Sequence, residues 1–195
     1  GSWRLEDFDD TSLGLTERQL LRAAVDLNHE LNDNVMLRGY YSFEQFDDEL
    51  DGHAFRPGIS LTIPEQRWTR DGRDRIHSLG AGFAWAAIPG KLDVDFDYTF
   101  SMADTDFDFS GGAGLQPVED APTLSSDLHS IQVTADWKLK EDRKLRIGYI
   151  FEYFDADDFA LDGVGVNSNP RMLSFGNEAP DYSAHVIGIS YVANW

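Results

Sequence analysis

Three histidines recur at one position of an internal repeat and are the first candidates for chemistry. His77, His129 and His185 open the similar segments 77–85, 129–137 and 185–193. Imidazoles share a metal ion only when they converge, and strands one hairpin apart place such residues about 10 Å or more from each other. We therefore expect these rings to anchor the chain at a boundary between polar and apolar surroundings, and we predict no metal site.

Acidic clusters are the second candidates, because carboxylate oxygens suit Ca²⁺. The clusters consist of Asp104, Asp106, Asp108, Asp155, Asp157 and Asp158. None has the twelve-residue spacing of an EF-hand, so a solvated acidic rim is the favoured interpretation, with divalent cations left open. A hydrolytic site would need His53 beside acidic or hydroxyl groups such as Asp51 and Ser60, and nothing in the spacing requires it. We therefore predict no catalytic residue and no enzyme activity.

The composition excludes several classes of protein. The 195 residues include 16 Lys and Arg against 35 Asp and Glu, and 16 − 35 gives a net charge of −19. Such a chain repels phosphate backbones, so we expect no nucleic-acid partner. There is no cysteine, which excludes disulfides, thiolate chemistry and covalent c-type haem attachment to this chain. We expect this chain to bind no cofactor.

A repeated hairpin of about 54 residues organises the chain. The segments that begin with histidine alternate with segments 37–43, 92–98 and 145–151, each of which continues into an acidic tail. Hydrophobic residues recur at every second position, which predicts strands. The predicted strands are 2–10, 17–31, 35–48, 75–88, 92–109, 127–140, 145–159 and 182–195. Tight turns near residues 32–34, 89–91 and 141–144 alternate with long predicted loops at 50–74, 110–125 and 160–181.

The alternation gives every strand two different faces. We expect the charged side chains of one face to line a lumen: Arg22, Asp26, Arg38, Asp93, Asp95, Asp97, Asp136, Lys138, Arg146 and Glu152. We expect the other face, with its aromatic ends, to contact lipid or its interface: Tyr41, Phe43, His77, Trp85, Phe96, Tyr98, His129, Trp137, Tyr149, Phe151, His185, Tyr191 and Trp195.

Three features favour a transmembrane barrel over a soluble β-domain, which would also alternate. The strands are long compared with the five or six residues typical of soluble proteins. Aromatic residues lie at the ends of the apolar face, as in outer-membrane barrels. The aligned Asp93, Asp95 and Asp97 could not lie unpaired in a dry core. We therefore predict an all-β, antiparallel, up-and-down barrel in the bacterial outer membrane, with about eight strands, short periplasmic turns and long extracellular loops.

Longer stretches of sequence resemble a known family. Residues 145–164, 173–191 and 87–100 are similar to the C-terminal region of MtrB/PioB outer-membrane proteins. The resemblance implies a sheath that holds and insulates a periplasmic multihaem c-type cytochrome. That cytochrome carries electrons across the membrane toward surface cytochromes or minerals. The haem would then belong to the partner.

The number of predicted strands raises two hypotheses for the architecture of residues 1–195. Barrels of this family have well over twenty strands, so the chain is either the C-terminal eight-stranded part of a larger barrel or a single small barrel domain. An eight-stranded barrel that closes on itself is filled by its own side chains and has no open pore and no cytochrome partner.

Overall fold

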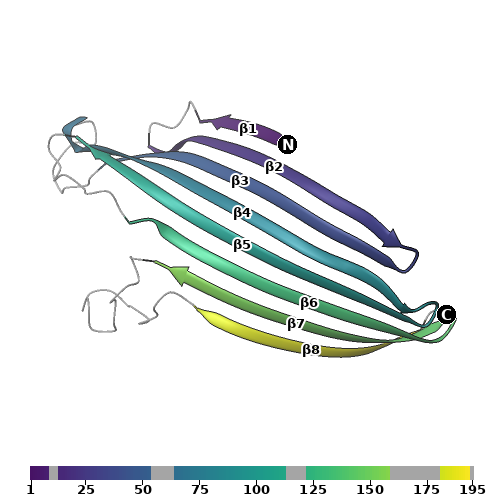
Figure 1. The fold of residues 1–195 in the computed structure, drawn as a ribbon. Coiled ribbons are helices and arrows are strands. Elements are labelled where there is room, and N and C mark those ends of the chain that lie inside the picture. Colours follow the sequence, from purple (N-terminus) through teal and green to yellow (C-terminus); the bar gives the residue numbers. More distant parts are fainter. Residues whose placement is uncertain (9–12, 54–63, 113–121, 159–180, 194–195) are drawn as a thin grey trace, which may run out of the picture. The chain divides into compact units, whose positions relative to one another are not determined.

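A computed structural model describes residues 1–8, 13–53, 64–112, 122–158 and 181–193 (Figure 1). It consists of one sheet whose eight strands follow the order β1-β2-β3-β4-β5-β6-β7-β8. The strands are β1 (Ser2–Asp7), β2 (Gly14–Asn32), β3 (Val35–His53), β4 (Arg67–Ile88), β5 (Leu92–Gly111), β6 (Leu124–Lys140), β7 (Arg143–Asp157) and β8 (Tyr182–Ala193). A short 3₁₀ turn, η1 (Pro64–Gln66), precedes β4.

Each strand forms because apolar and polar residues alternate along it, and short turns set the pairing of successive strands. The Asn32 side chain accepts a hydrogen bond from the Asn34 backbone N–H at 2.9 Å in the turn between β2 and β3. Gly90 adopts a φ of 74° in the turn between β4 and β5, a conformation that glycine adopts without strain. Strands β7 and β8 are antiparallel, with Phe151 opposite His185.

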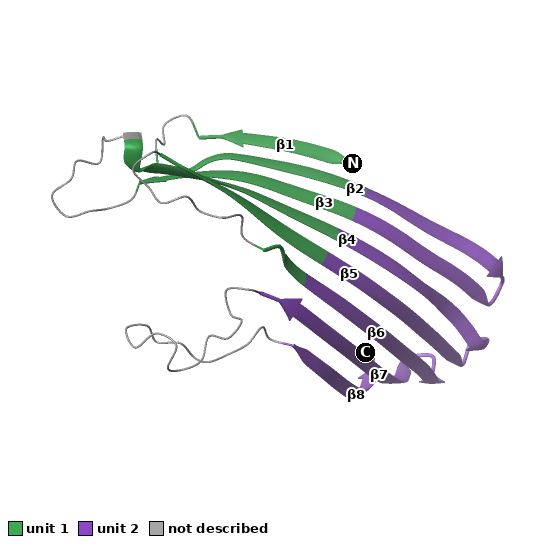
Figure 2. Ribbon diagram, turned by 60° about the vertical axis from the view of Figure 1, so that its left-hand side comes forward, with its two compact units in different colours: residues 1–23, 43–76, 103–125 green, residues 24–42, 77–102, 126–195 purple. Residues whose placement is uncertain are grey.

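The chain divides into two compact units, coloured separately in Figure 2. Unit 1 comprises residues 1–23, 43–76 and 103–125, and unit 2 comprises residues 24–42, 77–102 and 126–195. Strands β2 to β6 each contribute residues to both units. Among the described residues of either unit, no hydrophobic side chain is fully buried. The sheet therefore lacks the dry interior of a soluble β-sandwich.

The predicted all-β antiparallel fold is confirmed, and the described residues form the eight strands expected. The predicted loop 50–74 is wrong at both ends, because β3 continues to His53 and β4 begins at Arg67. Similarly, β5 continues to Gly111 and β6 begins at Leu124. Polar contacts link the extended parts of β3 and β4: Thr69 donates a hydrogen bond to Asp51 at 2.8 Å, and Arg73 pairs with Asp47 at 2.7 Å. The predicted loop 160–181 lies almost entirely outside the described residues.

Candidate membrane interface and polar face

In unit 2 the two faces of the sheet have opposite chemistry. Contacts between neighbouring strands identify an apolar face: the rings of Phe83 and Phe96 stack at 5.4 Å between β4 and β5. Large hydrophobic side chains on this face are solvent-exposed, and Ile187 of β8 has 73% of its surface accessible. We define the apolar face in unit 2 by Val25, Leu27, Leu79, Phe83, Trp85, Val94, Phe96, Ile131, Val133, Trp137, Ile147, Ile187 and Ile189.

A tyrosine–histidine hydrogen bond recurs on the apolar face in each full repeat. Tyr41 Oη lies 2.8 Å from His77 Nδ1, and Tyr98 Oη lies 2.8 Å from His129 Nδ1. The third pair, Tyr149 and His185, has a separation of 2.9 Å. The imidazoles also contact phenylalanine rings, with centroids 4.8 Å apart for Phe100 and His129 and for Phe151 and His185. We call this row of Tyr, His and Phe residues the histidine girdle.

Two tryptophans mark a second boundary of the apolar face, opposite the histidine girdle. Trp85 follows His77 by eight positions in β4, and Trp137 follows His129 by eight positions in β6. Eight residues at about 3.3 Å each span roughly 26 Å along a strand, or about 20 Å of depth at a tilt near 40°. The intervening side chains on this face in β6 are Ile131, Val133 and Ala135. The band between the two levels is therefore entirely apolar in β6 and approaches the 25 Å expected of a bilayer-spanning barrel.

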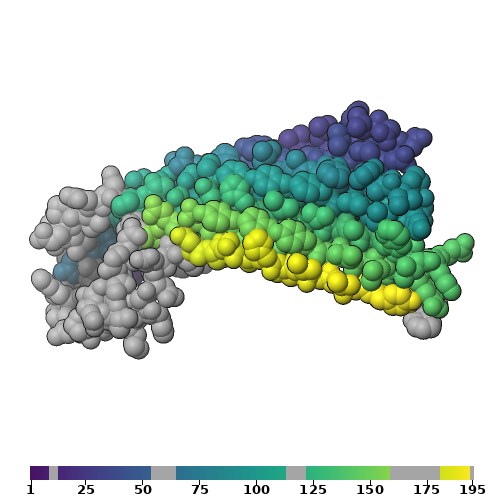
Figure 3. Space-filling model, turned by 60° about the horizontal axis from the view of Figure 1, so that its bottom comes forward, coloured from purple at the N-terminus to yellow at the C-terminus, as the bar shows by residue number. Residues whose placement is uncertain are grey.

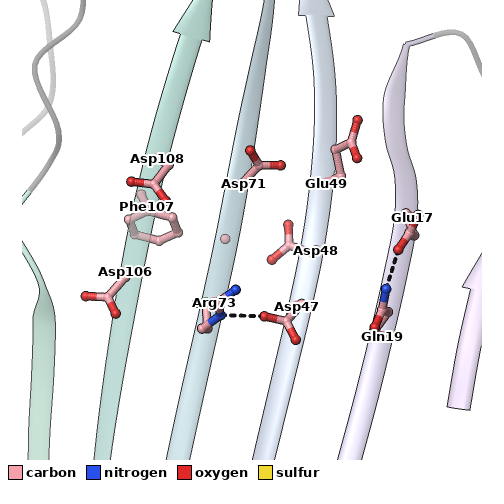
Figure 4. Close-up of a pocket in the computed structure, with 11 residues that line it drawn as sticks. Glu17, Gln19, Asp47, Asp48, Glu49, Asp71, Arg73, Asp106, Phe107 and Asp108 are labelled. Carbon is pink, nitrogen blue, oxygen red and sulfur yellow. Dashed lines mark hydrogen bonds and ion pairs between the residues drawn. The ribbon is translucent and has the colours of Figure 1, made fainter.

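Past the histidine girdle, the same side of each strand becomes charged in unit 1. In β3 the alternate positions after Phe43 are Gln45, Asp47, Glu49 and Asp51. Asp47 and Glu49, together with acidic residues of neighbouring strands, line a hollow of about 580 Å³ (Figure 4). Arg73 lies within the hollow and pairs with Asp47 at 2.7 Å. A change from apolar to charged side chains within a few positions is the pattern expected where a strand leaves a membrane.

The charges in this hollow shift the pKa values of individual groups. Burial raises the pKa of Glu49, and the neighbouring carboxylates Asp71 and Asp51 raise it further. Burial also acts to raise the pKa of Asp47, but hydrogen bonds from Arg73 and Gln45 outweigh it and hold that pKa below its usual value. No group of three or more acidic or histidine residues in the described ranges is arranged to hold a metal ion.

The opposite side of the strands in unit 1 is aromatic. The guanidinium of Arg70 lies 5.1 Å from the Phe107 ring centroid and forms an ion pair with Asp48. Phe107 and Phe109 are in ring contact at 6.4 Å, and Arg22 lies 5.9 Å above Phe46. This side of the strands in unit 1 therefore combines aromatic rings with arginine side chains.

The polar face of unit 2 is crossed by ion pairs. Arg38 Nη2 lies 3.0 Å from Asp95 and 3.1 Å from Asp97, which brings β3 and β5 side chains together over β4. Small residues in β4 make room for this contact, because a side chain at Gly80 or Gly82 would collide with Tyr40 or Asp97. Tyr40 in turn forms a hydrogen bond with Thr99 at 3.1 Å.

A second group of ion pairs lies near the short turns. Lys138 pairs with Asp93 at 2.6 Å. Asp136 accepts hydrogen bonds from Lys144 and Arg146, both at 2.6 Å. Asp93, Asp95 and Asp97, which are aligned in the sequence, thus each form an ion pair with a basic side chain.

Not every residue expected on the polar face joins this network. Arg22 lies in unit 1 and pairs with Glu44 at 3.1 Å. Asp26 and Glu152 form no ion pair among the described residues. On the apolar side, Trp195 lies outside the described ranges. Sequence reasoning missed the tyrosine–histidine hydrogen bonds, although the recurrence of Tyr and His in the repeat was a visible signal.

The comparisons with known proteins agree with an outer-membrane barrel. The family model of the outer membrane beta-barrel porins MtrB/PioB matches residues 1–195, and the chain belongs to this family. It is therefore an outer-membrane β-barrel protein of a porin-like family. The chain is 25% identical over 189 residues to the outer membrane protein MtrB of Shewanella baltica (strain OS185), and the match covers 96% of the chain but 26% of that relative. The chain thus spans about a quarter of the relative's length.

Solved structures with similar strands include the ferric-catecholate import receptor Fiu from E. coli K12. Its open form has a TM-score of 0.49 and a sequence identity of 11%. The match covers 90% of the present chain and 32% of the receptor chain. Its closed form has a TM-score of 0.46 and a sequence identity of 12%. That match covers 90% of the present chain and 30% of the receptor chain. Among the described residues, no helix has the length and apolar character needed to cross a membrane.

Proposed function

We propose that the chain forms eight strands of the wall of a larger outer-membrane barrel that holds and insulates a multihaem c-type cytochrome. The apolar face of unit 2 contacts lipid acyl chains, and the polar face lines the lumen. The haem resides on the partner, because the chain contains no cysteine for covalent haem attachment. The partner is periplasmic and passes electrons toward a surface cytochrome.

The observation that carries this proposal is the exposed apolar band bounded by the histidine girdle and the tryptophans. A soluble domain would leave this band in water, at roughly 25 cal/mol for each Å² of apolar surface. In a bilayer the same band is solvated by acyl chains. The exposed face therefore fits a membrane location, which the family assignment establishes independently.

The polar face supports the lumen assignment. Its cations and carboxylates pair with one another, and this pairing lowers the cost of placing charges beside a protein partner. Strands β1 and β8 are the outermost strands in the sheet order. The larger relative, about four times as long, suggests how further strands would complete the wall.

Copurification tests the proposal. The tagged chain would be purified in mild detergent from outer membranes of a bacterium that makes periplasmic multihaem cytochromes, and haem absorbance per chain would be measured. Thr134→Trp places bulk on the polar face, and Ala135→Trp places the same bulk on the apolar face at the adjacent position. We expect haem to copurify with the parent chain and with A135W but to be reduced with T134W. Absence of haem from the parent chain, or an equal loss in both variants, would contradict the proposal.

A further inference from the structure

Basic residues of unit 2 gather at its short turns. Residues 138–146 contain five Lys and Arg against two Asp and Glu, so 5 − 2 gives a local charge of +3 in a chain whose net charge is −19. Lys91 lies in the turn that joins β4 and β5. Figure 1 and Figure 3 show this turn and the turn between β6 and β7, coloured teal and green, at the same end of the strands. Short turns of this kind face the periplasm in outer-membrane barrels.

Most of these basic side chains already have a partner within the chain. Four of the five in residues 138–146 form ion pairs with aspartates. Lys140 forms no ion pair among the described residues, and neither does Lys91. These two ammonium groups can therefore pair with an anion from outside the chain.

Both the backbone and the side chain of Lys91 hold this residue at the boundary of the apolar band. Its N–H donates a hydrogen bond to the Ile88 C=O at 2.8 Å, and its C=O accepts one from the Lys138 N–H at 2.8 Å. Its ammonium nitrogen lies 5.2 Å from the centroid of the Trp137 ring, which is a cation–π contact. Because Lys140 follows Lys138 by two positions, it lies about 7 Å along β6 from the backbone contact of Lys91. The two lysines and Trp137 thus form one group at the end of β6.

Apolar side chains beside these lysines indicate which kind of anion fits. Trp137 is 39% exposed, and Leu139, two positions farther along β6, is 53% exposed. A free anion would pair with the lysines and leave this apolar surface in water. A phospholipid brings both a phosphate for the ammonium groups and acyl chains for the apolar surface. Since a zwitterionic headgroup carries its own cation, an anionic headgroup gains more from two lysines.

Resting on the lipid contact of the apolar face proposed above, we propose that Lys91 and Lys140 bind the phosphate of an anionic phospholipid in the periplasmic leaflet. Trp137 contacts the upper part of the acyl chains of the same lipid, next to the apolar band that contains Val133 and Ala135. The site retains anionic lipid at one point of a chain whose net charge otherwise repels it.

Two fluorophore positions on the apolar side of β6 test this proposal. Ala135→Cys places a label two positions from Trp137, and Ile131→Cys places the same label two positions from His129, at the other boundary. The parent chain contains no cysteine, so each variant carries one label. Labelled chains are reconstituted in phosphatidylcholine vesicles with a small fraction of phosphatidylglycerol, or of phosphatidylcholine, that carries a nitroxide near the top of one acyl chain. The ratio of quenching by the two nitroxide lipids measures the headgroup preference at each boundary.

The expected preference follows from the two unpaired lysines, because each lysine near a membrane surface is worth roughly a five-fold change in the association of an anionic lipid. We expect nitroxide phosphatidylglycerol to quench the label at residue 135 at least about five times as strongly as nitroxide phosphatidylcholine, with no such preference at residue 131. Lys91→Gln and Lys140→Gln should each lower the ratio at residue 135 roughly three- to five-fold, whereas Lys91→Arg should preserve it. Arg67→Gln, which removes the same charge in unit 1, should leave the ratio unchanged.

Equal ratios at residues 135 and 131, or an effect of R67Q as large as that of K91Q and K140Q, would overturn the proposal. Loss of the preference when an excess of inorganic phosphate is added at constant ionic strength would also overturn it, because the lysines would then form a site for free phosphate. Quenching by both nitroxide lipids without a headgroup preference contradicts only the phosphate site. If neither lipid quenches the label, the lipid contact of the apolar face is itself contradicted.

Discussion

Replacing Val133 by arginine should destabilise the protein strongly, because Val133 lies at the middle of the apolar band. It is four residues from His129 and four from Trp137, or roughly 13 Å along the strand from each level. At a tilt near 40° this places it about 10 Å deep from both boundaries. An arginine on the lipid face at the bilayer midplane costs about 2–4 kcal/mol, so we expect Val133→Arg to lower the free energy of unfolding by that amount.

Two matched variants make this test specific. Gln132→Arg adds the same charge at the adjacent position on the polar face and should change the free energy of unfolding by less than about 1 kcal/mol. Leu139→Arg adds it beyond Trp137 and should cost about 0–1 kcal/mol. The measurement is equilibrium unfolding in denaturant, followed by tryptophan fluorescence, in vesicles of short-chain phosphatidylcholine. A greater loss in Q132R than in V133R would refute the assignment of the faces.

Three further predictions concern individual contacts. Tyr98→Phe removes the hydrogen bond to His129 and should lower the free energy of unfolding by about 1 kcal/mol. A double-mutant cycle with His129→Phe should show coupling between the two residues, and strict additivity would argue against the hydrogen bond. Gly80→Ala should lower the free energy of unfolding by about 1–3 kcal/mol because the new methyl group collides with the Tyr40 ring. At Gly148 a methyl group meets no other atom, so Gly148→Ala should be neutral or stabilising. Equal effects of the two variants in denaturant unfolding would contradict the close packing at Gly80. The raised pKa of Glu49 means that the folded state binds its proton more tightly than the unfolded state, so the stability it contributes is present at low pH and lost as the pH rises through the folded pKa. Glu49→Gln should therefore stabilise the protein at pH 7 and have little effect near pH 3.5, and unfolding midpoints with the opposite trend would disprove the sign.

Much of the fold was predictable because period-two alternation is a local property of the sequence. The alternation in segments such as 92–102 identified the strands and separated their two faces. The short turns were predictable from residues such as Pro89 and Gly90. The extension of β3 from Glu49 to His53 was missed, since Asp51 and Gly52 disfavour strands locally. In the structure, the Thr69 hydroxyl of β4 donates a hydrogen bond to Asp51 at 2.8 Å and so links this extension to the neighbouring strand.

The tyrosine–histidine hydrogen bonds of the histidine girdle depend on the pairing register of neighbouring strands, which the pattern of a single sequence does not reveal. The hydrogen-bonded tyrosines and histidines are separated by 36, 31 and 36 positions. These unequal separations arise from the different lengths of the intervening connections. For the same reason the pairing of Arg22 with Glu44 was not foreseen. The residue types indicated the boundary, whereas the hydrogen bonds that build it required coordinates.

The most direct measurement is a nitroxide scan of β6, one cysteine at a time, from His129 to Trp137 in reconstituted bilayers. Because the parent chain contains no cysteine, each label reports a single position. Oxygen collisions should peak at Ile131, Val133 and Ala135, and collisions with a water-soluble nickel complex should peak at Gln132, Thr134 and Asp136. The opposite phase, or no alternation, would show that the apolar side of the sheet does not contact lipid.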